Sequence, residues 1–385
     1  MKTFLHIPVL LFTCLLWLSA CQPARSHVEE VPTSPDPQPK QRIMLALLLD
    51  TSNSMDGLID QAKSQLWRIV NELARAQCDD GSRPEIKIAL YEYGNDGLSS
   101  YEGYIRQVVN LSTDLDLISE KLFSLTTNGG SEFCGQVIHQ SLTELDWADN
   151  EMDVKMIFIA GNEPFTQGPI AFEKACLLAK EKGVVVNTIF CGDYQEGINT
   201  AWKAGADLAL GTYMSIDSDR KTVFISTPYD DKIAQLNQQL NNTYVYYGKE
   251  GVSKKSKQIE QDRNAGAVSE AAAVDRAVSK SSYAYKNESW DLVDAVASDA
   301  EVLEEIVVEE LPAELKDLDK EARKKYVEDK SKERAKIQKE IQALNSQRQA
   351  YIDAQKPEEE AASLDAALLK AIHSQGKQKQ LKWEK

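Results

Sequence analysis

Apolar and polar residues follow one another along residues 42–248 in a pattern that predicts alternating strands and helices. The nearly all-apolar run at 43–49 predicts a strand buried on both faces, and an amphipathic helix at 56–76 is expected after it. Further strands are expected at 86–93, 104–110, 154–160, 184–191 and 209–215, and further helices at 114–125, 133–147, 169–182 and 197–206. Only a short turn precedes 104–110, so this strand is expected to be antiparallel to its neighbour. The alternation predicts an α/β fold with a doubly wound, mostly parallel central sheet.

The composition changes after Gly248, where Lys, Glu, Ala and Gln become dominant. Residues 249–385 therefore predict a charged, helical and partly disordered extension to the α/β domain. Helices are expected at 265–281, 315–354 and 364–372. The aromatic residues within 283–296 are expected to dock back on the domain.

The long helical segment 315–354 has few apolar positions, and its part 327–336 is almost wholly charged. A sustained heptad therefore fails, and we favour a solvated single helix or a loose coil. A partner-binding coiled coil is the alternative. The Lys-rich segment 377–385 is interpreted as a frayed terminus, with contact to anionic lipid as the alternative.

The first residues predict an export signal at 1–20, with Lys2 before a short apolar core. The sequence Leu18-Ser19-Ala20-Cys21 resembles the lipobox of bacterial lipoproteins. This resemblance implies cleavage before Cys21 and lipidation of that residue, which would anchor the protein to a membrane without a spanning helix. The alternative is an ordinary cleaved signal with a chance cysteine.

Residues 21–41 are rich in Pro, Ser and Gln, and they predict a disordered tether between the lipid and the domain. Gln22 is not acidic, which in a lipoprotein of a Gram-negative cell favours the outer membrane over the inner one. The expected location is the bacterial cell envelope.

The net charge of −16 argues against nucleic acid as a partner, because phosphate neutralisation needs clustered Lys and Arg. Four cysteines remain beyond the signal and Cys21, namely Cys78, Cys134, Cys176 and Cys191. They permit three pairings that the sequence does not distinguish, and four buried free thiols are the alternative. The absence of a Cys-x-x-Cys or Cys/His cluster from the sequence argues against a zinc site.

Candidate chemistry lies at the end of the first predicted strand, where Asp50, Ser52 and Ser54 follow the apolar run. The carboxyl ends of strands are where open parallel α/β sheets hold their ligands. A carboxylate and two hydroxyls gathered in a turn form part of a shell of hard oxygens, which suits Mg²⁺. The alternative is a degenerate site in which Asp50 and Ser52 only cap the following helix.

The segment 43–215 resembles the von Willebrand factor type A (VWA) domain over about half of the chain. The resemblance is carried by the D-x-S-x-S sequence from Asp50 to Ser54, by Gly129-Gly130-Ser131, by the strand 156–160 with the following Gly161-Asn162-Glu163-Pro164, and by residues 202–213.

The resemblance implies a metal-ion-dependent adhesion site (MIDAS), in which the two serines bind the cation and the Asp acts through water. Ser131 stands where the family has a Thr, and Gly161 stands where it has an Asp. The change at Gly161 removes one negative charge from the shell. Glu132, Asn162 and Glu163 are the candidates to replace the missing ligand.

These features predict a binding module rather than an enzyme. Mg²⁺, or else Mn²⁺ or Ca²⁺, is the expected cofactor, and the carboxylate of a protein partner would complete its coordination. The alternative is a metal-free structural scaffold that recruits partners through its helical tail. An aspartyl phosphatase is disfavoured because Ser52 stands where a second carboxylate is needed. A serine hydrolase is disfavoured because Ser52 and Ser54 lack a glycine-flanked elbow, and because His139 lies on a predicted helix.

Overall fold

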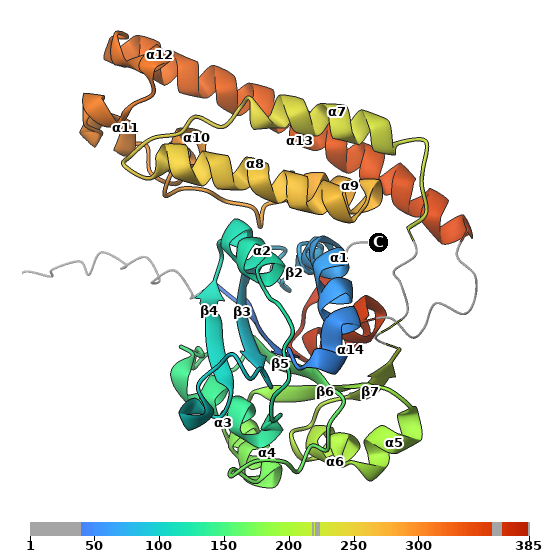
Figure 1. Ribbon diagram of the computed structural model, residues 1–385. Helices are drawn as coiled ribbons and strands as arrows, with labels where there is room; N and C mark the ends of the chain where they lie inside the picture. Colours follow the sequence, from blue (N-terminus) through green and yellow to red (C-terminus); the bar gives the residue numbers. More distant parts are fainter. Residues whose placement is uncertain (1–39, 218, 220–223, 356–363, 384–385) are drawn as a thin grey trace, which may run out of the picture. The chain divides into compact units, whose positions relative to one another are not determined.

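The computed structural model describes residues 40–217, 219, 224–355 and 364–383 (Figure 1). The predicted signal, Cys21 and nearly all of the tether lie outside the described residues. Lys40–Lys385 forms one compact unit, to which the helices after Gly248 also belong. None of the described helices combines the length and the apolar composition that crossing a membrane requires.

A six-stranded sheet forms the centre of the fold, with strand order β4-β3-β1-β5-β6-β7. The strands are β1 Arg42–Asp50, β3 Glu85–Tyr93, β4 Ile105–Ser112, β5 Val154–Gly161, β6 Val185–Cys191 and β7 Tyr213–Ile216. All neighbours in the sheet are parallel except β3 and β4. The predicted α/β class, the mostly parallel sheet and the antiparallel edge strand are confirmed.

Strand β1 is the centre of the hydrophobic core, since its residues pack on both faces of the sheet. Ile43, Leu45, Leu47 and Leu49 belong to one apolar cluster. Ala46 and Leu48 belong to the other cluster, on the opposite face. Alternate side chains of a strand point to opposite faces, which explains why the run is continuously apolar.

Helices cover both faces of the sheet. One face packs against α1 Asp56–Leu73, α2 Leu115–Phe123 and α14 Leu364–Gln378. The other face packs against α3 Cys134–Glu144, α4 Phe172–Glu181 and α6 Trp202–Leu208. This arrangement is the doubly wound one that the alternation predicts.

Several predicted boundaries are corrected. The first helix ends at Leu73 rather than at 76, and Ala76–Gln77 forms a short strand, β2. The helix predicted at 197–206 is two helices, α5 Tyr194–Asn199 and α6, because Ala201 between them has a left-handed φ of 73°. The last strand begins at Tyr213 rather than at 209, because Gly211 passes so close to the Val186 carbonyl that it has no room for a side chain.

A set of helices follows the sheet along the chain. They are α7 Asp230–Asn241, α8 Gly251–Val268, α9 Glu270–Lys280, α10 Leu292–Ser298, α11 Val302–Glu305, α12 Ala313–Lys316 and α13 Lys320–Gln355. The described residues also include the 3₁₀ turns η1 Asn53–Met55, η2 Ser100–Glu102 and η3 Val308–Glu310. Helices α7, α8, α9 and α13 pack side by side, and we call these four helices the helical layer (Figure 1).

Helix α13 corrects the prediction of a solvated single helix or loose coil. One side of α13 packs on α7, α9 and α10, and it buries Val327, Ile337 and Ile341. Arg334 and Arg348 are buried on the same helix. Arg334 pairs with Asp291 and Asp294, and Arg348 pairs with Asp230 and Asp275. The apolar pattern is sparse because paired arginines occupy positions that a coiled coil would fill with Leu.

Buried charges also join the helical layer to the domain. Arg276 on α9 is fully buried, 2.7 Å from Asp116 on α2 and 2.9 Å from Asp262 on α8. Lys280 lies 2.8 Å from the same Asp262. Burial raises the pKa of Asp262, but the charges of Lys280 and Arg276 outweigh it and hold that pKa well below its usual range. The predicted docking of the aromatic segment is confirmed by buried Tyr285, whose hydroxyl donates to Asp116.

Helix α14 completes the face of the sheet that α1 begins. Leu368 and Ile372 are buried in the same cluster as β1, and α14 contacts β5 and β6. The predicted frayed terminus is corrected as well, because Lys382–Trp383 forms strand β8, which pairs with β2. The expected short helix at 364–372 is confirmed and extends to Gln378.

Replacing Leu368 by Ala should lower the free energy of unfolding by about 2–5 kcal/mol, because the lost methyl groups leave a cavity between α14 and the sheet. Urea denaturation followed by circular dichroism measures this change. Lys370→Ala, at an exposed position of the same helix, is the control and should change stability little. Equal stability of Leu368→Ala and wild type would show that α14 does not stabilise the domain.

Replacing Arg276 by Met should lower the free energy of unfolding by about 3–5 kcal/mol, because Asp116 loses its buried partner and Asp262 loses one of two. Lys286→Met breaks an exposed pair with Glu288 and should cost less than about 1 kcal/mol. The same denaturation experiment compares the two. Similar losses of unfolding free energy in both variants would contradict the view that the buried pairs of Arg276 help to hold the helical layer on the domain.

Candidate functional site

Three strand ends meet at the carboxyl edge of the sheet. The register of the parallel pairs places Asp50 of β1 opposite Tyr93 of β3, and Leu49 opposite Ala160 of β5. Gly161, which follows Ala160, therefore lies beside Asp50. The loops that continue from these strands carry the predicted site residues.

Asp50 has a buried carboxylate without a cationic partner. Its side chain is 0 % exposed, and its Oδ1 accepts a hydrogen bond of 2.8 Å from the Ser52 backbone N–H. No described group makes a hydrogen bond of normal geometry to its Oδ2, although the Asn162 backbone N–H is near enough to lower the pKa of Asp50. Burial raises the pKa of Asp50 to about 7, although the hydrogen bonds from Ser52 act in the opposite direction. A buried oxygen without a well-placed donor indicates that something absent from the chain itself belongs there.

The two serines of the D-x-S-x-S turn lie together. Ser52 Oγ and Ser54 Oγ share a hydrogen bond at 3.3 Å, and the Asn162 amide donates to Ser54 Oγ at 3.1 Å. Ser52 is buried and Ser54 is exposed, so the pair reaches from the protein interior to solvent. The Ser52 side chain makes no capping hydrogen bond to the turn that follows, contrary to the helix-cap alternative.

The loop between α2 and α3 is held against this turn. The Asn128 backbone N–H donates to the Thr51 carbonyl at 2.9 Å, and the Asn95 amide donates to the Thr126 carbonyl at 2.9 Å. Gly130 lies so close to the Gly94 carbonyl that any side chain there would collide with it. This contact explains the need for glycine before Ser131.

Glu132 is the second buried carboxylate of the site. A Cβ built on Gly94 would lie 2.8 Å from Asp50 Oδ1 and 2.9 Å from Glu132 Cγ, so both side chains pack against this glycine. Burial raises the pKa of Glu132 to about 7, and the negative charges of Asp50 and Glu163 add to the effect. Asp50 and Glu163 therefore lie close enough to Glu132 for their charges to oppose its ionisation.

The structure shows why residue 161 is glycine, which the sequence alone did not reveal. A Cβ at this position would lie 2.5 Å from the Tyr93 hydroxyl and 2.9 Å from Asp50 Oδ2. The Tyr93 hydroxyl donates to the Ala160 carbonyl at 2.9 Å and fills the space that an aspartate would need. Tyr93 was missed because its only signal is its place at the end of the neighbouring predicted strand.

Hydrogen bonds join Asp50, Ser52, Ser54 and Asn162. The carboxylates of Glu132 and Glu163 lie near enough to Asp50 for their negative charges to repel one another. Ser131 follows Gly130 in the adjoining loop, and its side chain makes no hydrogen bond to any described residue. Among the described residues, no group of three or more His, Cys, Asp or Glu side chains is arranged to hold a metal. A cation here would need serine hydroxyls and water among its ligands.

The four cysteines beyond Cys21 are free and buried, so the alternative of buried thiols holds and no disulfide joins them. Cys134 lies near the site, with its Sγ 3.9 Å from the Tyr93 hydroxyl. Burial raises the pKa of the Cys134 thiol above its ordinary range, which makes it unreactive.

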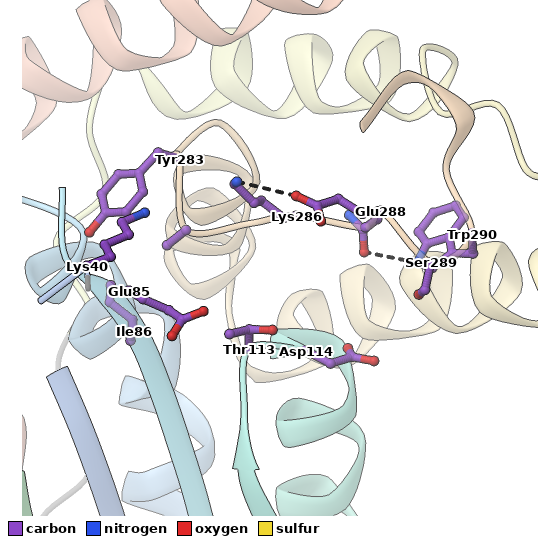
Figure 2. Close-up of a pocket in the computed structure, with 12 residues that line it drawn as sticks. Lys40, Glu85, Ile86, Thr113, Asp114, Tyr283, Lys286, Glu288, Ser289 and Trp290 are labelled. Atoms are coloured by element: carbon purple, nitrogen blue, oxygen red, sulfur yellow. Dashed lines mark hydrogen bonds and ion pairs between the residues drawn. The ribbon is translucent and has the colours of Figure 1, made fainter. Parts of the chain in front are cut away.

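A cavity of about 310 Å³ lies at the other end of the strands, where β3 begins (Figure 2). Its lining includes Glu85 at the start of β3, Asp114 at the start of α2 and Trp290. Figure 2 shows Lys286 turned toward Glu288, with which it pairs at 3.3 Å. Its charges are mixed and partly paired with one another, so this cavity is a weaker candidate than the carboxyl edge.

Comparison with family models finds no match, and comparison with curated proteins finds none. Solved structures are similar. The conserved hypothetical protein BatB from Bacteroides thetaiotaomicron is 17 % identical, over 46 % of this chain and 90 % of that chain, with a TM-score of 0.35. The SpRpn10 VWA domain is 18 % identical, over 46 % and 88 %, with a TM-score of 0.34. Proximal thread matrix protein 1 from the mussel byssus, described with a zinc-occupied MIDAS motif, is 15 % identical, over 47 % and 43 %, with a TM-score of 0.34.

The topology of this chain itself agrees with the resemblance found in its sequence. The sheet order, the antiparallel edge strand β4 and the D-x-S-x-S turn at the end of the central strand β1 are those expected of a VWA domain. The fold from β1 to β7 is a VWA fold.

Replacing Gly161 by Asp should lower the free energy of unfolding by about 1–3 kcal/mol, because the new Cβ collides with the Tyr93 hydroxyl and approaches Asp50. In the Tyr93→Phe background the same replacement should cost less, since the colliding oxygen is gone. Urea denaturation in EDTA measures both. Gly266→Asp, where a Cβ meets no atom within 4 Å, is the control. Equal costs of Gly161→Asp in the two backgrounds would contradict this explanation.

Proposed function

We propose that the protein is a cell-envelope protein, anchored by lipid at Cys21, whose VWA domain binds another protein through a divalent cation. Asp50, Ser52, Ser54 and Ser131 are the proposed shell, with Glu132 in place of the aspartate that Gly161 excludes. Asn162 and Glu163 are reserve ligands from the loop after β5. Mg²⁺ is the proposed cation, with Mn²⁺ or Ca²⁺ as substitutes.

The observation that carries the proposal is the unsatisfied Oδ2 of Asp50. A buried carboxylate normally has a cation or hydrogen-bond donors around it, because burial otherwise penalises its charge. Asp50 instead faces two further carboxylates, those of Glu132 and Glu163. A divalent cation would relieve the repulsion among the three and supply the missing partner.

The open side of the shell supports the choice of a binding module. Mg²⁺ takes about six oxygen ligands and dehydrates reluctantly, so a shell of serine hydroxyls would leave positions for water or an external carboxylate. Ser54 is exposed, which would let an Asp or Glu of a partner reach the cation. The described residues place no histidine in hydrogen-bond contact with Ser52 or Ser54, so neither serine has the usual histidine base of a nucleophile.

The alternative is a scaffold that recruits partners through its helices without metal. The observation that favours it is the exposure of two valines after α11: Val307, just before η3, is 55 % exposed, and Val308, the first residue of η3, is 40 % exposed. The metal hypothesis has the stronger support, because two isolated exposed valines are ordinary surface features whereas a buried unpaired carboxylate is rare.

Calorimetric titration of the full-length protein with Mg²⁺ and Mn²⁺ tests the proposal. Wild type should bind, and Ser52→Ala and Glu132→Gln should each weaken binding by about tenfold or more. Ser346→Ala, an exposed serine on α13, is the matched control and should bind as wild type. Because the pKa values of Asp50 and Glu132 are about 7, protons compete with the cation below pH 7 and the affinity should fall as the pH is lowered.

The absence of heat in folded wild-type protein above pH 7, with either cation, would remove the metal from the proposal. Equal binding by wild type and Ser52→Ala would place the cation elsewhere.

A further inference from the structure

The loops at the carboxyl edge carry carboxylates around Asp50. We call this set the acidic rim; it consists of Asp56, Asp96, Glu102, Glu132, Glu163 and Asp193. These residues come from five separate segments, which follow β1, β3, α2, β5 and β6. Asp96, Glu102 and Asp193 are exposed and are not part of the proposed cation shell.

The same loops carry no basic residue. Residues 51–62, 94–104, 124–136, 162–171 and 192–202 contain neither Lys nor Arg. None of the rim carboxylates makes an ion pair within the described part of the chain. Three basic residues border these loops and each has a partner. Arg106 pairs with Glu92, Lys203 pairs with Asp207, and the Lys63 ammonium donates to the Leu125 carbonyl at 3.3 Å. The segment after β7 differs, since its sequence includes Arg220 and Lys221.

A second observation points to a ligand at this edge. Asp50, at the centre of the rim, is fully buried, and its Oδ2 accepts no hydrogen bond of normal geometry from the described residues. The carboxyl edge therefore combines exposed negative charge at its periphery with an unsatisfied acceptor at its centre.

An aromatic side chain stands among these charges. Tyr101, on η2 in the loop between β3 and β4, is 100 % exposed. Tyrosine and arginine are enriched among the residues that contribute most to protein interfaces, and a tyrosine ring attracts a Lys or Arg placed over its face. A fully exposed tyrosine beside Glu102 suits a basic side chain.

The helical layer leaves this edge open. The segment after α9 meets the domain at the other end of the strands, where the Tyr283 hydroxyl donates to the Pro84 carbonyl just before β3 begins. Helix α9 contacts the last turns of α1, where the Asn71 amide donates to the Asp275 carbonyl at 2.9 Å. Asp56 of the acidic rim lies in the first turn of α1, at the opposite end of that helix.

We propose that the acidic rim docks a Lys- and Arg-rich segment of a partner protein, with the exposed carboxylates pairing with its cations and Tyr101 lying against one of them. Complementary charge speeds encounter and selects among partners, and its effect weakens with salt. This inference goes beyond the proposed cation site, since the rim residues Asp96, Glu102 and Asp193 act without metal.

Fluorescence anisotropy of a labelled peptide of Lys, Arg and Ser, in EDTA and at low salt, tests the docking with the full-length protein. The peptide should bind wild type, and a matched peptide of Glu, Asp and Ser should not. The triple variant Asp96→Asn/Glu102→Gln/Asp193→Asn should weaken binding about tenfold, and Tyr101→Ala should weaken it several-fold. Asparagine at 193 keeps the cap of α5.

The matched control removes three exposed charges elsewhere, in Glu301→Gln/Glu305→Gln/Glu309→Gln near α11 and η3. Equal losses in the two triple variants would show that the peptide responds only to net charge and would overturn the proposal, as would no binding or preference for the acidic peptide. The peptide is titrated in EDTA and Mg²⁺ is titrated by calorimetry without peptide, so failure of the cation site and failure of the rim give different results.

Discussion

The burial of β1 on both faces is the constraint on which the rest of the structure depends. Alternate residues of this strand enter the two apolar clusters, so neither cluster forms without it. The same burial carries Asp50 into the edge of the core, where its carboxylate lacks a full set of donors. Hydrophobic packing of β1 thus fixes the position of the Asp50 carboxylate, although a charged group is unfavourable in an apolar core. Backbone hydrogen bonds, such as the one from the Asn128 N–H to the Thr51 carbonyl, hold the surrounding loops around this carboxylate.

Much of the fold and part of the site could be predicted from the sequence because they rest on local patterns. The apolar run at β1 and the amphipathic helices gave the class, and the D-x-S-x-S turn gave Asp50, Ser52 and Ser54. Tyr93 could not be found in this way, because its role comes from a contact with Gly161 two strands away. The loss of aspartate at Gly161 is readable in the sequence, but its steric cause is visible only in three dimensions.

The helices after Gly248 were harder to predict because their packing uses charges. A sequence pattern counts Arg276, Arg334 and Arg348 as polar, yet each is buried and paired with aspartates. Hydrophobic periodicity misses a helix whose inward face is partly made of such pairs. Buried pairs of this kind tolerate only one arrangement of partners, so they favour a unique packing even where their net contribution to stability is modest.

The position of α14 has a consequence for the order in which the protein is made. Its partners α1, β5 and β6 are synthesised early, whereas α14 emerges only after α7 to α13. During synthesis the part of this face of the sheet that α1 and α2 leave uncovered therefore stays exposed to aggregation or to a chaperone until α14 is made. The α/β domain completes its packing only when α14, near the end of the chain, packs against strands that were made long before it.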